Sequence, residues 1–217
     1  MIPVAHPAVV PPLLDQEFRA QPSPADPDAA WGSFAGKSEV TAALTPVQRD
    51  LCCYCEETLG RHGSHIDHVV PKSKDHAGTF CFQNLVLSCI TSGELQNLAR
   101  RQVSCGHYRL SEYDAALFIK PTEPDCGDYF SCKENGDLQR TPGLPANKAA
   151  RADYMIRELN LNTTRLSRRR EDWLKAVRKQ MAAMGYQQDA IVWFFRDCLR
   201  EGKPFVSVIR EYFGWIQ

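Results

Sequence analysis

Apolar positions follow a helical period through the last third of the chain. After Pro145, apolar side chains recur every three or four residues, as they do on a helix that buries one face. The pattern predicts helices over 149–159, from a cap at Asn162 to about 184, over 191–199, and over 205–215. Gly202 and Pro204 are expected to end the third of these helices.

A different pattern precedes these helices. Residues 47–88 are expected to form a β-hairpin, with Cys52-x-x-Cys55 as a tight knuckle and a strand over 64–70 that Pro71 stops. After Asn84 the chain is expected to turn helical through Leu85, Leu87 and Cys89. Residues 90–104 are expected to form a polar insertion, partly helical over 93–101. Further on, Asn135-Gly136 predicts a short hairpin from residues 129–132 and 137–140.

Prolines dominate the N-terminal part. Seven of the first 30 residues are Pro, which excludes a continuous helix and most strand pairing. We expect an extended arm with a short helix around Leu13–Arg19, and this arm either wraps the body or is mobile. A helix is expected over Lys37–Leu44, with Ser38 as its N-cap and Pro46 beyond its end. The chain therefore divides into an arm (1–45), a core (46–118) and a hairpin with a helical region (119–217), in an α+β fold.

Composition limits the class of protein. The 217 residues can bury one sizeable core. Because 26 basic residues balance 26 acidic ones, a nucleic-acid surface has to be a local patch. No apolar run approaches the ~20 residues that span a bilayer, and no signal peptide is visible. We expect a cytoplasmic protein without membrane contact, whose nine cysteines are reduced and can bind metal.

Four cysteines have the spacing of metal ligands. Thiolates three residues apart on a tight turn can both bind one tetrahedral ion at ~2.3 Å, which makes Cys52 and Cys55 half of a structural zinc (Zn²⁺) site. Cys89 and Cys105 are the expected second half. The long segment between them costs little, because the free energy of loop closure depends only logarithmically on length. Alternative ligands are Cys53 and Cys81.

An Asp-His pair lies between these cysteines. Hydrolysis of a phosphodiester needs a base that deprotonates water and a cation that takes up charge on the phosphate. An imidazole suits the first role at neutral pH, so His68 is the predicted general base. Asp67 offers hard oxygen to Mg²⁺ or Mn²⁺. Adjacent strand residues point to opposite faces, so the two can share a site only where the strand breaks, and Pro71 makes that break credible.

The order of these motifs resembles the HNH endonuclease motif of the ββα-metal fold. The matching segments are Cys52-x-x-Cys55, Asp67-His68-Val-x-Pro-x-Ser73, Asn84-Leu-x-x-x-Cys89 and Cys105-x-His107. The resemblance implies a zinc-containing nuclease core, in which Asn84 fixes the imidazole or the loop facing it and His107 is the second protein ligand of the catalytic ion. In the family the last cysteines and the histidine usually adjoin. Here about fifteen residues separate Cys89 from Cys105, and Gly106 precedes His107, which could instead bind zinc.

Most of the chain beyond its first ~30 residues also resembles one HNH subfamily, the nuclease subunits of Septu-type and retron-associated anti-phage systems. The similarity rests on Trp31 through Tyr54, on Cys126-x-x-Tyr129-Phe130 and on Leu159-Asn160-Leu161-Asn162 with the arginines that follow. It implies an effector nuclease that works with a partner ATPase. A retron reverse transcriptase with its RNA–DNA is a further implied partner.

Basic residues around the proposed site are expected to contact phosphate. They are Lys72, Lys74, Arg100, Arg101 and Arg109, of which Arg109 is the leading candidate. Seven cations between Arg165 and Lys179 could follow a nucleic-acid backbone, meet an acidic partner or be solvated. His65, on the strand face of Asp67, could touch substrate, but a surface histidine is the expected interpretation.

DNA is the expected substrate in preference to RNA. Two alternatives to this interpretation remain. The first is a zinc-stabilised module that binds nucleic acid without cleaving it. The second is a stand-alone restriction-type HNH nuclease.

Overall fold

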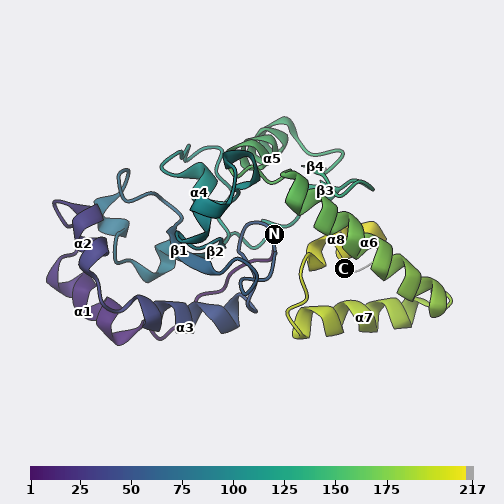
Figure 1. The fold of residues 1–217 in the computed structure, drawn as a ribbon, viewed down its shortest axis with the longest axis horizontal. Helices are drawn as coiled ribbons and strands as arrows, with labels where there is room; N and C mark the ends of the chain where they lie inside the picture. The colour runs from purple at the N-terminus through teal and green to yellow at the C-terminus, as the bar shows by residue number, and fades with distance from the viewer. Residues whose placement is uncertain (214–217) are drawn as a thin grey trace.

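Two antiparallel strands lie near the centre of the fold (Figure 1). The computed structural model describes residues 1–213, with side chains through residue 209. Strand β1 (Ser64–His68) pairs with β2 (Leu85–Cys89), so that Ser64 lies opposite Cys89 and His68 opposite Leu85. All five residues of β2 are buried, whereas the first four of β1 are partly exposed. Of the two strands, β1 is therefore the one that can line a site.

Strand β2 corrects the prediction of a helix after Asn84. Its sequence is almost wholly apolar because both faces of the strand are covered. A short apolar run looks the same in a buried strand and in a buried helix, so periodicity does not separate the two. The strand predicted at 64–70 is confirmed but ends at His68, where the Arg109 guanidinium binds the carbonyl oxygens of His68 and Val69.

The N-terminal arm is docked on the body. Its helices are α1 (Pro12–Ala20), α2 (Pro27–Ser33) and α3 (Lys37–Val47), at the left of Figure 1. The Val4 amide donates to the Pro121 carbonyl (2.8 Å). The His6 ring donates to the Leu85 carbonyl (2.8 Å), and Leu14 is fully buried. The helix expected around 13–19 is thus confirmed, and of the two alternatives for the arm the structure shows the wrapped one.

Two helix caps differ from those predicted. Helix α3 begins after Gly36 instead of at a Ser38 cap, and it continues through Pro46 to Val47. Pro46 lies in the last turn, where its missing amide removes one hydrogen bond without interrupting a longer helix. Helix α6 (Thr164–Ala183) is capped by Thr163, whose Oγ1 accepts from the Leu166 amide (3.2 Å). Asn162, the predicted cap, instead bonds both backbone groups of Leu138 (2.8 Å each).

Short elements connect β2 to the C-terminal helices. The 90–104 insertion forms 3₁₀ helices over Glu94–Asn97 and Arg100–Gln102, and the short helix α4 (Gly106–Arg109) follows it. The predicted hairpin is confirmed as β3 (Phe130–Cys132) paired with β4 (Leu138–Arg140). Its turn requires glycine, because Gly136 has φ +81° and a side chain there would begin 1.9 Å from the Ser167 carbonyl oxygen.

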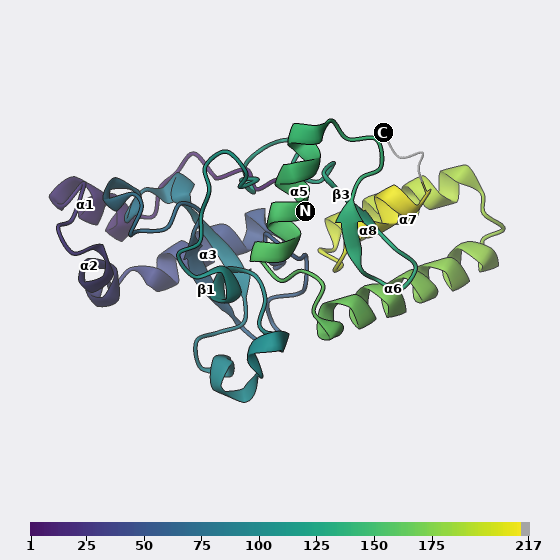
Figure 2. The same ribbon diagram turned by 90° about the horizontal axis from the view of Figure 1, so that it is seen from above.

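The C-terminal helical period is confirmed. The helices are α5 (Ala146–Glu158), α6, α7 (Gln188–Arg200) and α8 (Val206–Phe213). In Figures 1 and 2, α6 and α7 extend away from the central sheet, and with α8 they enclose a separate apolar cluster that includes Met181, Ile191 and Phe195. Trp215, part of the predicted last helix, lies outside the described residues. Within residues 1–213, no helix has the length and apolarity needed to span a membrane.

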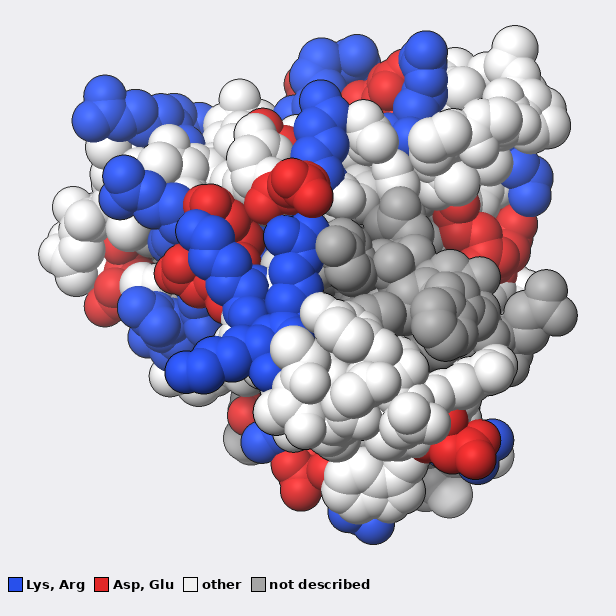
Figure 3. Space-filling model, turned by 90° about the vertical axis from the view of Figure 1, so that its right-hand side faces the viewer, with Lys and Arg blue, Asp and Glu red and all other residues white. Residues whose placement is uncertain are grey.

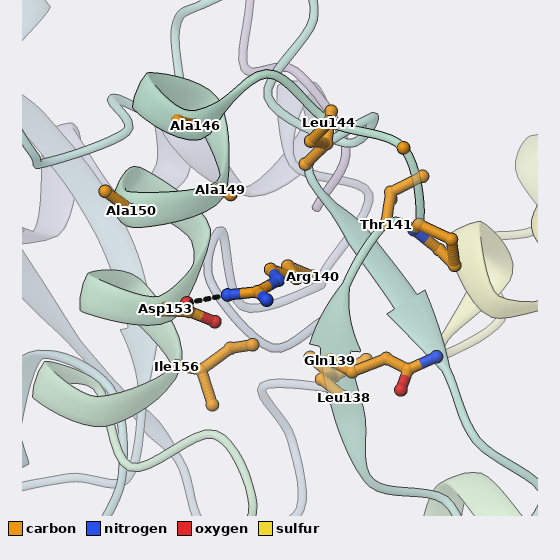
Figure 4. A pocket seen from close by; sticks show the side chains of 12 residues that line it. Leu138, Gln139, Arg140, Thr141, Leu144, Ala146, Ala149, Ala150, Asp153 and Ile156 are labelled. Atoms are coloured by element: carbon orange, nitrogen blue, oxygen red, sulfur yellow. Dashed lines mark hydrogen bonds and ion pairs between the residues drawn. The ribbon is translucent and has the colours of Figure 1, made fainter.

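A hollow of about 940 Å³ lies between β4 and α5 (Figure 4). Arg140 on β4 bonds the Asp153 carboxylate on α5 (2.6 Å), and small side chains such as Ala146 and Ala149 line the rest. Its lining holds no cysteine or histidine. The candidate chemistry therefore lies elsewhere in the fold.

The cations of α6 are largely engaged in contacts within the protein. Figure 3 shows Lys and Arg side chains at this end of the molecule interspersed with acidic ones. Arg165 and Arg169 both pair with the buried carboxylate of Glu57. Lys175 pairs with Glu171 (2.6 Å) on the same helix.

Arg170 belongs to the core. Its side chain is fully buried, and its Nη atoms donate to the carbonyls of Gly136 (3.1 Å) and Leu161 (2.9 Å). Of the seven cations between Arg165 and Lys179, fewer are therefore available to a partner or nucleic acid than the sequence indicates.

We predict that Arg170→Ala lowers the free energy of unfolding by about 2–4 kcal/mol, because two buried carbonyl groups lose their donor. Arg168→Ala is the matched control. Arg168 is exposed on the same helix, and its loss should change that free energy by less than about 0.5 kcal/mol. Urea unfolding followed by circular dichroism measures both, and equal effects would contradict a core role for Arg170.

Candidate active site and metal centre

Four buried thiols meet behind the central sheet. The Sγ atoms of Cys52, Cys55, Cys89 and Cys105 all lie within 4.8 Å of one another. They come from the knuckle before β1, from the end of β2 and from the residue before α4. Cys53 is buried outside this group, and the half-buried Cys81 contacts Gln83 instead (3.6 Å). The predicted set of four cysteines is therefore the one that the fold assembles.

The chemistry of this group suits a metal ion. Burial raises the pKa values of the Cys55 and Cys105 thiols. Burial also acts against ionisation of Cys52, but hydrogen bonds from Cys105 and the other nearby thiols outweigh it and hold the pKa of Cys52 well below its usual range. Four thiol ligands at close range match a tetrahedral ion such as Zn²⁺.

A pocket of about 520 Å³ opens on the exposed side of β1, between this strand, α2 and α4. Figure 1 shows α4 next to the two strands. Asp67 and His68 both line this pocket, together with His107 and His65. Because β1 ends at His68, the two adjacent side chains share one cavity, as the predicted site requires.

Asp67 is held by one of its two oxygens. Its Oδ2 accepts from the Tyr54 hydroxyl (2.7 Å) and from Arg109 Nη2 (3.1 Å). Its Oδ1 lies 3.0 Å from the point where a side chain on Gly106 would begin. The carboxylate is thus oriented by Oδ2, and Oδ1 faces α4.

His68 is buried with a defined tautomer. Its Nε2 lies 3.0 Å from the Thr79 carbonyl, which can only accept, so Nε2 carries the proton and Nδ1 has the free electron pair. The edge of the ring meets Trp31 of α2, with centroids 4.6 Å apart. Burial lowers the pKa of His68 to about 4. The imidazole is therefore uncharged at neutral pH and able to accept a proton.

Asn84 organises the loop that follows β1. It ends a 3₁₀ helix (Phe82–Asn84), and its Oδ1 accepts from the Val70 amide (2.8 Å). Its Nδ2 donates to the carbonyls of Val70 (3.0 Å) and Gly78 (3.1 Å). Asn84 lines a different hollow, of about 590 Å³. Of the two roles expected for Asn84, the geometry fits the one that fixes the loop.

Gly106 brings His107 against β1. A Cβ on Gly106 would lie 2.8 Å from both the Asp67 Cγ and the His65 Nε2, so the residue that interrupts the family motif has to be glycine here. The His107 ring stacks on His65, with centroids 3.7 Å apart and planes 28° apart. Burial lowers the pKa of His107 to about 4, and its buried Nε2 has no hydrogen-bond partner among the described residues.

The predicted phosphate contacts separate into two groups. Arg109 is fully buried, and its guanidinium donates to Asp67 and to the carbonyls of His68 and Val69. The prediction that Arg109 is the leading phosphate contact is therefore wrong, because the side chain holds the end of β1 and is not accessible. Arg100 donates to the His107 and Tyr108 carbonyls.

Four of these basic residues remain accessible, since Arg100 is also exposed. Lys72 lines the pocket and pairs with Asp28 of α2 (3.1 Å). Lys74 and Arg101 are exposed. Lys72 is therefore the one best placed to meet a phosphate.

Three residues that contact the site were not predicted from the sequence. Trp31 comes from the arm, and no local pattern connects it to His68. Tyr54 lies inside the Cys52–Cys55 knuckle, and the sequence presents Gly106 only as an interruption of the motif. His65 did give a signal, because it lies two residues before Asp67 in a strand and must share its face.

We predict that Asn84→Ala loosens the loop after β1, because the Val70 amide loses its acceptor. Hydrogen exchange at Val70 should accelerate, and the free energy of unfolding should fall by about 1–3 kcal/mol. Gln83→Ala, at the exposed neighbouring position, should leave both unchanged. Unaltered exchange at Val70 in Asn84→Ala would contradict this role.

Comparison with known proteins agrees with the motifs. No family model matches the chain. Over 113 residues, which are 50% of this chain, it is 32% identical to the protein of Vibrio cholerae serotype O1 biovar El Tor named "Retron Vc95 putative HNH endonuclease". The chain spans about half the length of this curated relative (51%). Over that half, the chain is similar to a retron-associated HNH endonuclease, which confirms the resemblance that its motifs indicated.

Proposed function

We propose that this chain is a metal-dependent HNH endonuclease that hydrolyses phosphodiester bonds of nucleic acid, DNA in preference to RNA. The observation that carries the proposal is the pocket in which Asp67, His107 and the uncharged His68 meet. The buried group of four thiols supports it, because Cys105 of this group directly precedes Gly106 and His107 of the pocket, and so does the name of the relative. In this proposal, residues 46–118 form a ββα-metal core of β1, β2 and α4. The arm (1–45) and the C-terminal part (119–217) complete it.

The residues present fit two kinds of ion. The four thiols fit a structural Zn²⁺. Asp67 Oδ1 and His107 Nε2, which has no hydrogen-bond partner among the described residues, fit a catalytic Mg²⁺ or Mn²⁺, and both residues line the same pocket. When bound there, the ion would take up charge that develops on the phosphate and on the leaving oxygen.

The chain's own groups provide the remaining chemistry. His68 Nδ1 accepts a proton from the attacking water, while the Thr79 carbonyl holds Nε2–H and fixes the ring. Tyr54 and Arg109 orient the Asp67 carboxylate through hydrogen bonds to Oδ2. Lys72 can exchange its contact with Asp28 for a phosphate oxygen.

We predict that His68→Ala lowers the rate of DNA cleavage in Mg²⁺ or Mn²⁺ by about 10²- to 10⁴-fold, because the general base is lost. DNA affinity and the unfolding midpoint should stay close to wild type. His76→Ala, at an exposed position in the loop that follows β1, is the control and should cleave normally. A wild-type chain that binds DNA without cutting any DNA or RNA substrate would favour the zinc-stabilised binding module instead.

We predict that the purified protein carries about one zinc ion per chain, bound by the four clustered thiols. Cys89→Ala should lose the zinc and unfold at lower temperature, because a structural zinc contributes directly to folding. Cys53→Ala removes a buried thiol from outside the group and should keep its zinc. Elemental analysis with thermal denaturation measures both, and zinc retained by Cys89→Ala would contradict the assignment.

We further propose that the nuclease is the effector of an anti-phage system and works with an ATPase encoded beside it, with a retron reverse transcriptase and its RNA–DNA as additional partners. The relative's name, which associates it with a retron, supports this role, and the ATPase rests on the motif resemblance. Phage protection in cells that express the whole gene cluster tests it. Protection should be lost with His68→Ala or without the ATPase. Protection by the nuclease gene alone would favour the stand-alone enzyme.

A further inference from the structure

The indole of Trp31 lies against the proposed general base. Trp31 is in the last turn of α2, and its ring meets the His68 imidazole with centroids 4.6 Å apart and planes 83° apart. Both residues line the same pocket. Edge-to-face contacts of this kind are attractive and depend on the relative orientation of the two rings. The contact therefore joins the N-terminal arm to the reactive part of the proposed site.

The hydrogen bond of the imidazole does not by itself fix the plane of the ring. His68 Nε2 donates to the Thr79 carbonyl (3.0 Å). A hydrogen bond restrains the position of one ring atom, but carbonyl oxygens accept over a broad range of directions, so the ring can still turn about that atom. The indole provides a second restraint, on the ring itself. The two contacts together set the direction in which Nδ1 presents its electron pair.

Trp31 is itself held from several sides. Its ring lies 5.3 Å from the Phe34 ring and 6.0 Å from the Phe80 ring, measured between centroids. The Lys37 ammonium lies over the indole, 5.8 Å from its centroid, at the distance of a cation–π contact. An indole held in this way presents a fixed surface to the imidazole.

The helix that carries Trp31 is attached to both of its neighbours. Asp28, three residues earlier and so on the same side of α2, pairs with Lys72 in the loop after β1 (3.1 Å). Lys37 of α3 donates to the Gly32 carbonyl (2.9 Å). Helix α2 is therefore tied to the pocket on one side and to α3 on the other, and this keeps the indole in place.

Core packing alone does not account for the position of Trp31. Phe34 is buried and packs on Phe80, with centroids 5.5 Å apart, so this pair already docks the same part of the arm. Trp31 stays partly exposed on the wall of the pocket. Among its three ring contacts, the one with His68 has the shortest centroid distance. The indole is thus placed for the imidazole as well as for the core.

We infer that Trp31 is a positioning residue for His68, whose imidazole it holds so that Nδ1 faces a substrate in the pocket. This inference rests on the proposed function and deepens it. A general base takes a proton only from a water molecule within hydrogen-bond reach. An imidazole that turned freely would spend less time in the productive orientation. The arm is then part of the catalytic unit and not only a cover of the core.

Steady-state cleavage of DNA by the full-length protein in Mg²⁺ or Mn²⁺ tests this role. Trp31→Ala should lower kcat by about 10- to 100-fold, because a small misplacement of a reacting group costs rates of this size, and should leave KM within about twofold. Trp31→Phe keeps an aromatic ring and should retain most of kcat. Val40→Ala is the control for general destabilisation, since Val40 is fully buried on α3 and does not line the pocket. It should lower the unfolding midpoint without changing kcat.

Nuclear magnetic resonance of the free protein gives a second readout that does not depend on cleavage. The Nε2–H proton of His68 should be visible in the wild type and in Val40→Ala, because it is hydrogen-bonded and shielded from water. In Trp31→Ala its signal should be lost through faster exchange with water. An unchanged signal in Trp31→Ala would overturn the inference. A fall in kcat no larger than that of Val40→Ala, or no larger than that of Trp31→Phe, would overturn it too.

The two readouts separate failure of this inference from failure of the proposed function. If Trp31→Ala cleaves DNA as fast as an active wild type, only the positioning role is rejected. If the wild type cleaves no DNA or RNA but Trp31→Ala still loses the His68 signal, the indole does hold the imidazole, and the nuclease assignment is rejected instead.

Discussion

The grouping of four thiols is the constraint on which the rest of the site depends. Cys52 and Cys55 precede the central hairpin, Cys89 ends it, and Cys105 lies beyond an insertion, yet their sulfur atoms meet in one buried place. Cys105 adopts φ +60° directly before α4. Because the Cys105 side chain is held among the other three cysteines, the next two residues, Gly106 and His107, lie against β1. The position of His107 is therefore set by the thiol group rather than by the four-residue helix on which it lies.

Hydrogen bonds from neighbouring residues fix the side chains of Asp67, His68 and His65, each through one of its two polar atoms. Asp67 has one oxygen bound by Tyr54 and Arg109 and one that faces α4. His68 has one nitrogen bound to a backbone carbonyl, and so has His65. In each of the three residues, hydrogen bonds to one polar atom fix the orientation of the side chain. In the proposed function, the other polar atom of Asp67 and of His68 is the one used for chemistry, and the fixed orientation preorganises the site.

Sequence reasoning went furthest where a residue's role depends on its own type and spacing. The four cysteines, the Asp67-His68 pair and the helical period after Pro145 could all be predicted, because ligand chemistry and side-chain periodicity are local properties. Strand β2 could not, since a buried strand and a buried helix share an apolar pattern. Nor could the burial of Arg109 or the approach of Trp31 to His68, because these contacts join segments about 40 residues apart and depend on how the elements pack. The role of Gly106 could not be predicted either, because it depends on the close approach of Asp67 and His65 from β1.

The double ion pair of Glu57 has a consequence for how this protein can be controlled. The carboxylate lies two residues after Cys55 and is fully buried, while both of its cationic partners, Arg165 and Arg169, belong to the first turns of α6. Arg165 also donates to Ser104, the neighbour of Cys105 (3.0 Å). A molecule that pulled α6 away would leave the Glu57 carboxylate buried without its cations, next to the group of four thiols. Displacement of the C-terminal helices would thus be felt at the thiol group, through Glu57 and through Ser104.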